Sequence, residues 1–183
     1  GLVVGNYMNM AVTLACYASI CKHTGRPFVY PGSPQQYRAA TDVTDARLLA
    51  KQLNWAAVTP EAANMAFNTA NGDVFRWTWL WAQIAEYFGL EVAEYPGHPT
   101  PLEGQMTDAP AIWSEIVAQH GLQDIPIGKL ASWWHSDADL GRELECFTDM
   151  TNSRTLGFDA YQSTRASFFD VFDELRARRI IPS

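Results

Sequence analysis

The segment from Phe67 to Gly89, which reads FNTANGDVFRWTWLWAQIAEYFG, constrains the fold of this chain more than any other. Together with the apolar run before it, the segment predicts a strand at residues 65–70 that ends at the turn dipeptide Asn71-Gly72. Asp73 then stands where a helix N-cap is expected, because its carboxylate can accept hydrogen bonds from free backbone N–H groups. Gly89 is typical of a helix C-cap. The segment therefore predicts a strand, a tight turn and a helix.

One face of this predicted helix is apolar along its whole length. Its apolar side chains recur at helical spacing, at Trp77, Leu80, Trp81, Ile84 and Phe88. Taken alone, these residues favour a structural unit that packs into a large core.

The rest of the chain alternates helical periods with turn residues. Apolar periodicity and capping residues predict helices at 8–23, from Thr44 or Asp45 to Thr59-Pro60, from Thr107 or Asp108 to 120, at 127–144 and at 164–179. Short strands are predicted at 28–30 and 146–150, and loops at 34–37, 95–104 and 153–162. In the second of these helices, one face is expected to hold Leu49, Leu53 and Ala56.

Charge and composition exclude several classes of function. With 183 residues, 48% of them hydrophobic and 13% aromatic, the chain can form one domain with a sizeable core. A formal net charge of −7 speaks against a nucleic-acid or membrane partner, because nucleic acids and anionic membranes need a basic surface. Neither a signal peptide nor an apolar stretch of membrane-spanning length is visible. The cysteines lack metal-ligand spacing and are expected to be reduced thiols in a cytoplasmic protein: Cys16, Cys21 and Cys146.

No self-contained active site can be read from the sequence. It holds no GxSxG elbow, no HExxH pair and no phosphate loop, and its histidines are scattered, at His23, His98, His120 and His135. No metal site and no catalytic residue is therefore predicted in this chain. A glycine-rich dinucleotide fingerprint is also absent, so the chain has no evident means to cradle a pyrophosphate. The start at Gly1, without methionine, indicates processing or a piece of something longer.

Three segments resemble one known family. The string AFNTANGDVFRW, followed by WAQIAEYFG, is similar to the late part of extended short-chain dehydrogenases, closest to the progesterone 5β-reductase and iridoid synthase group. The opening NYMNMAVTLACYASICK resembles that group's SMMNLxxTLxVYAxICK, and the closing DMTNSRTLGFDAYQS resembles its last segment. The string Val43-Thr44-Asp45-Ala46 matches the family's V-x-D-A element, although Asp45 alone is interpreted as an N-cap. The resemblance runs from Gly1 to Pro182 and is to the second half of the family.

The resemblance implies an α/β fold class: the mostly helical, C-terminal substrate-binding part of a Rossmann-type short-chain dehydrogenase, with a few strands. It implies one domain or fragment over residues 1–183, in which 65–89 is a strand-turn-helix of the Rossmann sheet. Residues 90–163 would be lid and loops, and 164–183 the final helix. The glycine-rich loop and the catalytic Tyr-x-x-x-Lys pair would lie upstream of Gly1, so this chain alone is expected to be inactive. A strand that has lost its neighbours is an unpaired edge, which favours dimerisation, element swapping or rearrangement.

The same resemblance implies a cofactor loop beside the nicotinamide, formed by Val4, Gly5 and Asn6. Asn6 departs from the family's serine, which leaves no hydroxyl for the role of that serine. The residues implied to face the substrate are Tyr7, Met8, Met10, Phe158 and Tyr161. Judged without the family, the two methionines begin an amphipathic helix and favour the core, and the two late aromatics favour loop anchors.

The function implied is that of an NAD(P)H-dependent oxidoreductase that reduces an enone-type or carbonyl small molecule. NAD(P) would be bound by the full-length parent and not by this chain alone, and a homodimer is possible in such a family. A nucleotide-sugar epimerase or dehydratase on the same scaffold is the first alternative, and it would need basic residues to grip a diphosphate, such as Arg26, Arg38 and Arg47. A non-catalytic binding or assembly module is the second alternative, supported by the missing glycine-rich loop.

Overall fold

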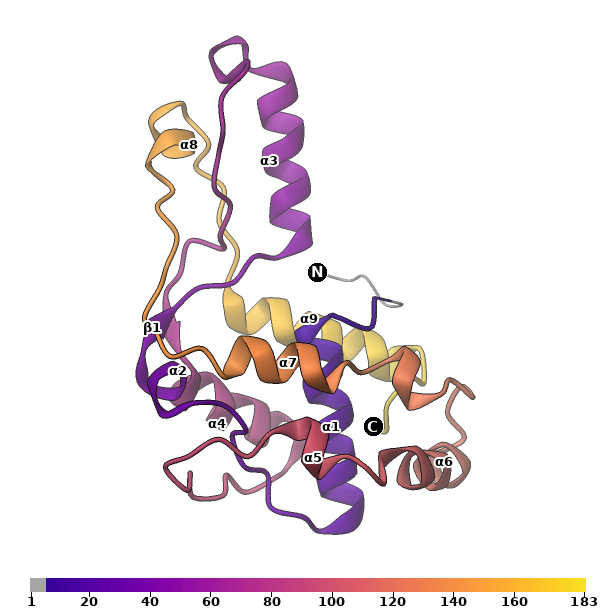
Figure 1. The fold of residues 1–183 in the computed structure, drawn as a ribbon. Helices are drawn as coiled ribbons and strands as arrows, with labels where there is room; N and C mark the ends of the chain where they lie inside the picture. The colour runs from indigo at the N-terminus through magenta and orange to yellow at the C-terminus, as the bar shows by residue number, and fades with distance from the viewer. Residues whose placement is uncertain (1–5) are drawn as a thin grey trace.

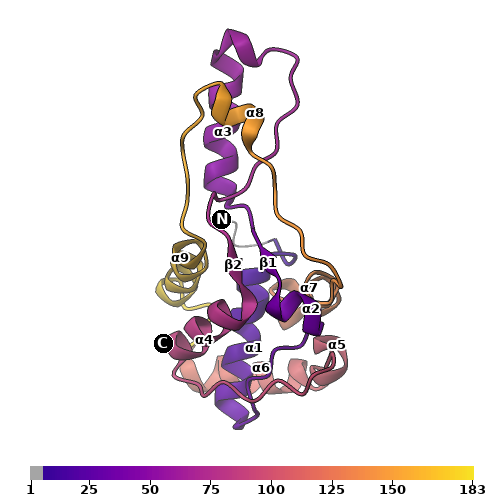
Figure 2. The same ribbon diagram turned by 90° about the vertical axis from the view of Figure 1, so that its left-hand side faces the viewer.

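The computed structural model describes residues 6–183. Helices surround a central helix, α1 (Met10–Thr24), and a small antiparallel sheet lies at one side of this body. Helices α3 (Ala46–Val58) and α8 (Thr151–Thr155) form an arm that projects from the body in both Figure 1 and Figure 2. The body and the arm meet where α9 (Thr164–Ala177) begins, and this junction positions the site described below.

The remaining elements are short. The helices are α2 (Pro34–Arg38), η1 (Pro60–Ala62), α4 (Trp77–Phe88), α5 (Leu102–Gln105), α6 (Ala109–His120), η2 (Ile127–Lys129) and α7 (Trp133–Leu140). The two strands are β1 (Ala40–Thr41) and β2 (Phe75–Arg76), which pair antiparallel. None of the helices within residues 6–183 combines the length and the apolar character needed to cross a bilayer.

Helix α1 is buried on every side from residue 11 to residue 21. The side chain of Asn9 caps its start by accepting from the N–H groups of Ala11 and Val12, and Gly25 ends it with a left-handed φ of 71°. All residues from 11 to 21 are buried, because α4, α6, α7 and α9 pack around the helix. The helix predicted at 8–23 is confirmed, although its burial is complete and not limited to one stripe.

The start of α4 and the hydrogen bonds of Asp73 differ from the prediction. Helix α4 ends at Gly89 as expected, but it begins only at Trp77, because residues 75–76 pair with β1 first. Asp73 is therefore not its N-cap. The Asp73 carboxylate instead accepts from the backbone N–H of Thr164 at 2.8 Å and from its hydroxyl at 2.6 Å, so it stabilises the start of α9.

The predicted strands do not form within residues 6–183. Residues 65–70 run extended beside α3, but no strand pairs with them there. Residues 28–30 and 146–150 each contribute only one isolated bridge, Phe28 with Val92 and Cys146 with Thr41. A strand exists only by pairing, so a local apolar pattern cannot secure one without a neighbour.

Several boundaries also differ from the prediction. The segments predicted as loops contain α2, α5 and α8, and α2 starts because Ser33 accepts from the N–H of Gln36 while Pro34 occupies the first turn. The helix predicted at 127–144 is split into η2 and α7. Between them the N–H of Ser132 donates to the hydroxyl of Thr13 on α1 at 3.1 Å, and not to a carbonyl of its own helix.

A cluster of aromatic side chains connects α2 and α4 with the segment between α1 and α2. The ring of Trp81 stacks on Phe28 with centroids 4.4 Å apart and meets Tyr30 edge-on at 5.3 Å. Tyr30 in turn stacks on Tyr37 of α2 at 4.6 Å. These contacts fix the segment 28–37 against α4 without the predicted strand ladder.

Replacing Gly32 by alanine is expected to destabilise the chain by about 2 kcal/mol. A Cβ atom at Gly32 would overlap the carbonyl group of Leu140, which already accepts from Ser33 N–H at 3.0 Å and from the Tyr30 hydroxyl at 3.1 Å. Urea denaturation measures the loss. Gly104→Ala is the control, because a Cβ atom there meets no atom within 4 Å. An equal, small effect of both substitutions would contradict the packing argument.

Candidate functional site

A pocket lies where the start of α1 meets the first turns of α3 and α9. Its volume is about 320 Å³. Asn6, Met8 and Met10 line it from the start of the described chain, while Val43 and Leu49 line it from the α3 side and Phe168 from α9. The lining is mainly apolar, with amide and hydroxyl groups at Asn6, Asn9, Thr44 and Ser167. Such a combination suits a small apolar molecule that carries one or two polar atoms.

The structure brings some of the predicted site residues together and leaves others apart. Val4 and Gly5 lie outside the described residues. Asn6 lines the pocket with Met8 and Met10, and its side-chain oxygen accepts from the N–H of Met8 at 3.1 Å. Tyr7, exposed beside them, is not among the lining residues.

The two late aromatics lie on the arm. Phe158 is buried against Trp55 of α3, with ring centroids 5.3 Å apart, and Tyr161 is 73% exposed. Neither lines this pocket, so their contact with a substrate stays a prediction. Sequence reasoning did not name the other lining residues as site residues: Asn9, Ala11, Val43, Thr44, Asp45, Ala46, Leu49, Ser167 and Phe168. For residues 43–46 the match to the family's V-x-D-A element was a signal, whereas for Leu49 and Phe168 the only signal was their apolar character.

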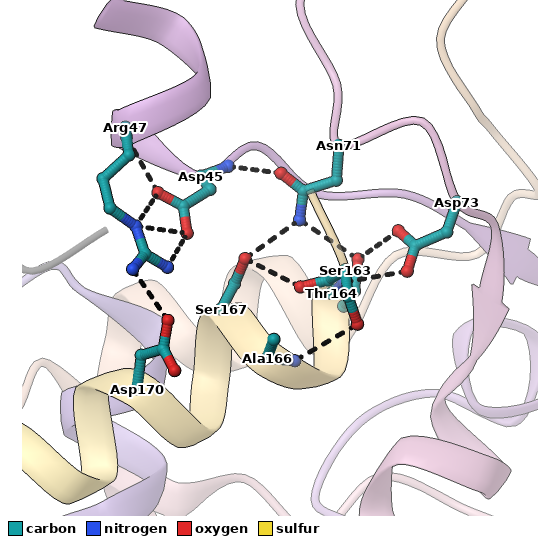
Figure 3. Close-up of polar contacts among 9 residues, drawn as sticks. All are labelled: Asp45, Arg47, Asn71, Asp73, Ser163, Thr164, Ala166, Ser167 and Asp170. Carbon is teal, nitrogen blue, oxygen red and sulfur yellow. Dashed lines mark hydrogen bonds and ion pairs between the residues drawn. The ribbon is translucent and has the colours of Figure 1, made fainter. Parts of the chain in front are cut away.

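A charge network around the buried carboxylate of Asp45 borders the pocket (Figure 3). The Asp45 side chain is 0% exposed, and Arg47 donates to both of its oxygens, with Nε 3.0 Å from Oδ1 and Nη2 2.6 Å from Oδ2. Nη1 of Arg47 also reaches Asp170 of α9 at 2.7 Å. Although burial alone raises the pKa of Asp45, hydrogen bonds from the side chain and backbone of Arg47 outweigh it and hold that pKa well below its usual range.

Asn71 is the hub that joins the arm to the body (Figure 3). Its side-chain oxygen accepts from the N–H of Asp45 at 2.7 Å, and its amide nitrogen donates to the hydroxyls of Thr164 at 3.1 Å and Ser167 at 3.4 Å. Its backbone N–H donates to Val43, and its carbonyl accepts from Gln162. The side chain is fully buried, so all of its polar atoms are satisfied inside the protein.

The side chains that line and border this pocket are suited to binding and positioning a ligand. Asp45 is the ionisable residue among those lining the pocket, and Arg47 occupies both of its carboxylate oxygens. Among the described residues, no lysine or arginine lines the pocket to meet a phosphate. Within residues 6–183, no three His, Cys, Asp or Glu side chains gather as metal ligands would.

Two of the three arginines considered for a diphosphate are paired with carboxylates. Arg26 donates to Asp108 just before α6, with Nη1 3.0 Å from Oδ1, whereas Arg47 pairs with Asp45 and Asp170 at the junction of arm and body. The third, Arg38, is exposed at the end of α2 and is not among the described residues that line the pocket. Arg26 follows the C-terminal end of α1, whereas Arg47 follows Asp45 and Ala46, which line the pocket with the first residues of α1, so the two do not converge on one ligand.

Comparison with known proteins identifies similar chains. The family model described as the PRISE-like Rossmann-fold domain matches residues 3–182. Identity is 40% over 178 residues to the (S)-8-oxocitronellyl enol synthase of Camptotheca acuminata, and 40% over 177 residues to that of Nepeta cataria. It is 37% over 176 residues to the 3-oxo-Delta(4,5)-steroid 5-beta-reductase of Arabidopsis thaliana. Each alignment covers 96% of this chain and 45% of the relative, so the chain spans about half the length of these curated relatives.

Proposed function

Because this chain belongs to the family of PRISE-like Rossmann-fold domains, we propose that it is the substrate-binding portion of an NAD(P)H-dependent short-chain oxidoreductase. The whole protein would reduce an enone-type or carbonyl small molecule. The observation that carries this proposal is the 40% identity, over 96% of the chain, to proteins named enol synthases. The family resemblance predicted from the sequence is confirmed by the match over residues 3–182.

The residues of this chain do not fit a complete dinucleotide. The sequence lacks a glycine-rich loop, and the pocket lining offers no basic side chain for a pyrophosphate. We therefore assign the cofactor phosphates and the catalytic pair to an upstream half, and to Val4, Gly5 and Asn6 only the wall beside the nicotinamide. NAD(P) would supply the hydride in the parent protein.

This chain would contribute shape and a dry surface. Met8 and Met10 present flexible apolar side chains, which adapt to irregular small molecules and exclude water from the reacting atoms. Tyr7 and Tyr161, whose side chains are exposed, would close the pocket from outside once a substrate and the upstream half are in place. We also propose the substrate contact that the resemblance implies for Phe158. We further propose that residues 1–183 act as one substrate-binding unit in a cytoplasmic protein, in keeping with free Cys16, Cys21 and Cys146.

In the protein made from the complete reading frame, Met8→Ala is expected to raise KM for an apolar enone about tenfold with little change in kcat. The reason is that truncating an apolar wall removes binding that substrate and transition state share. Steady-state NADPH oxidation measures both constants. Leu144→Ala is the control, because Leu144 is an exposed leucine that does not line the pocket and should leave both constants unchanged.

The two alternatives predict other outcomes of the same assay. A nucleotide-sugar epimerase or dehydratase would convert a nucleotide sugar and leave the enone untouched. A binding or assembly module would leave NADPH unoxidised with either compound, even in the complete protein. Either result would overturn the proposed reductase.

A further inference from the structure

A second pocket lies at the opposite end of α1 from the candidate site. Its volume is about 230 Å³, and it forms where the last turn of α1 meets the ends of α6 and α9. Helix α1 has 15 residues and therefore spans about 22 Å, and the two pockets share no lining residue. In Figures 1 and 2 this end of α1 lies on the side of the body away from the arm. We call the hollow bordered by Lys22, His120 and Arg176 the α1–α6–α9 pocket.

Basic side chains from three helices gather in the α1–α6–α9 pocket. They are two cationic groups and two imidazole rings, at Lys22, His23, His120 and Arg176. Among residues 6–183, no aspartate or glutamate side chain lines it. The chain as a whole carries 13 Lys and Arg against 20 Asp and Glu, so this local excess of positive charge runs against its overall composition. A cleft lined by one sign of charge concentrates ions of the opposite sign, and this one therefore favours an anion.

The guanidinium of Arg176 is held in a fixed plane. Its central carbon lies 4.2 Å from the ring centroid of Tyr87 and 5.3 Å from that of Phe88, and its Nε donates to the carbonyl of Pro182 at 3.3 Å. The Tyr87 ring is in turn held by its hydroxyl, which donates to Asp173 at 2.5 Å. A guanidinium positioned in this way presents a fork of N–H groups that matches two oxygens of an oxyanion.

Compensation of helix dipoles is the simpler explanation for basic residues at this place, because cations are favoured near helix C-terminal ends. Basic residues do occupy the last turns of α1 and α6. The carbonyls of these ends, however, have other partners: the hydroxyl of Thr24 donates to Ile20 at 2.8 Å, and the N–H of Leu122 donates to Val117 at 3.1 Å. The helices are thus closed without the basic side chains.

Carboxylates of the chain itself do not occupy these donors. Within the described part of the chain, the side chains of Lys22 and His120 make no hydrogen bond and no ion pair. Nε2 of His23 lies 3.5 Å from a carboxylate oxygen of Glu115, which is outside the pocket lining. The ammonium group and the imidazole of His120 are therefore available to a ligand that enters the pocket.

We propose that the α1–α6–α9 pocket binds a phosphate group, carried either by inorganic phosphate or by a small organic monoester. The fork of Arg176 can meet two of its oxygens, while the ammonium of Lys22 and the imidazole N–H of His120 can donate to a third. A carboxylate has only two oxygens and would leave part of this donor set unused, whereas a phosphate monoester offers three strong acceptors. This site lies apart from the proposed substrate pocket and does not depend on the proposed reductase activity.

The test is isothermal titration calorimetry of the protein from the complete reading frame with sodium phosphate, at neutral pH and an ionic strength kept constant with chloride. Lys22→Met and His120→Gln, on different helices, are each expected to weaken binding about tenfold, because each removes a donor to the anion. Both residues are exposed, so neither change should prevent folding. Lys22→Arg keeps the charge and should retain binding. Lys129→Met is the control, because Lys129 is exposed in η2 and does not line the pocket.

Glycerol phosphate, titrated in the same way, identifies the source of the phosphate group. Tighter binding than that of inorganic phosphate supports the proposal with an organic monoester as ligand, and equal or weaker binding supports it with free phosphate. Because an upstream half would hold cofactor phosphates, the titration is repeated with NADPH at saturation.

Four results would overturn the proposal. They are the absence of binding with both compounds, binding unchanged by Lys22→Met and His120→Gln, binding that disappears when NADPH is present, and equal weakening by Lys22→Met and Lys129→Met. The last result would mean that phosphate responds only to net charge. Calorimetry measures none of the reductase activity, so failure here and failure of the proposed function are distinguishable.

Discussion

Asn71→Asp should destabilise the folded chain by about 4 kcal/mol at neutral pH. The substitution keeps the shape of the side chain but removes both N–H donors, which now serve the hydroxyls of Thr164 and Ser167. It also places a carboxylate in a fully buried position between Asp45 and Asp73. The loss combines two hydroxyl oxygens that face an acceptor in place of a donor with a buried negative charge, and both effects are costly.

Urea denaturation at several pH values tests this expectation. The deficit should shrink as the pH falls and be smallest below the ordinary aspartate pKa, about 4, because the new carboxyl group is then neutral in both the folded and the unfolded state. Asn64→Asp is the matched control, since Asn64 is exposed and aspartate tolerates its left-handed φ of 59° about as well. A variant at residue 71 that is as stable as this control would show that the hub does not hold the arm to the body.

The substitution Arg47→Met is expected to have the second large effect: it should lower the free energy of unfolding by about 3 kcal/mol at pH 7. The methionine keeps the apolar stem but removes the guanidinium, so the buried carboxylate of Asp45 loses its ion pair with Arg47. The loss is placed below the largest values known for broken buried pairs because Arg47 is itself 35% exposed and water screens part of the interaction.

The pH dependence of this pair has a defined sign. In the wild type the pKa of Asp45 is depressed, so its stabilising contribution is complete above the ordinary aspartate pKa near 4 and is lost as the pH falls below it. The stability difference between wild type and Arg47→Met should therefore be largest at neutral pH and diminish in acid. Arg178→Met is the control, because Arg178 pairs with Glu174 on the surface at 3.8 Å and should cost less than about 0.5 kcal/mol. Equal losses for the two arginines would refute the role of the buried pair.

Local patterns predicted the helices well where the caps are local. Gly25, Gly89 and Gly121 end helices at the residues expected from their lack of a side chain, and Asp45 caps α3 as its type and place suggest. The prediction that Asp73 is an N-cap of α4 was wrong because its hydrogen-bond partner is not local. Its partner, Thr164, lies 91 residues away, and no pattern within one helical turn reports such a contact.

The candidate site shows the same division. Asn6, Met8 and Met10 could be named from a family resemblance in one continuous segment, and they do line one pocket. Phe168 could not be named as a site residue from the sequence. The helical periodicity around it indicates only an apolar face, and its place in the pocket depends on how α9 packs. Leu49 and Leu53 share a face as expected, but that face points away from the core. Periodicity states which residues lie together and not what covers them.

The complete burial of residues 11–21 in α1 has a consequence for how substitutions in this protein would be tolerated. On a half-buried helix such as α4, acceptable changes recur with the helical period, and a mutational scan reads out that period. From residue 11 to residue 21 no position faces water, and even Ser19 is committed, to the carbonyl of Ala15 at 2.8 Å. A mutational scan of residues 11–21 would therefore show that substitutions are poorly tolerated at every position. The helical period of this central helix would not be visible in such a scan.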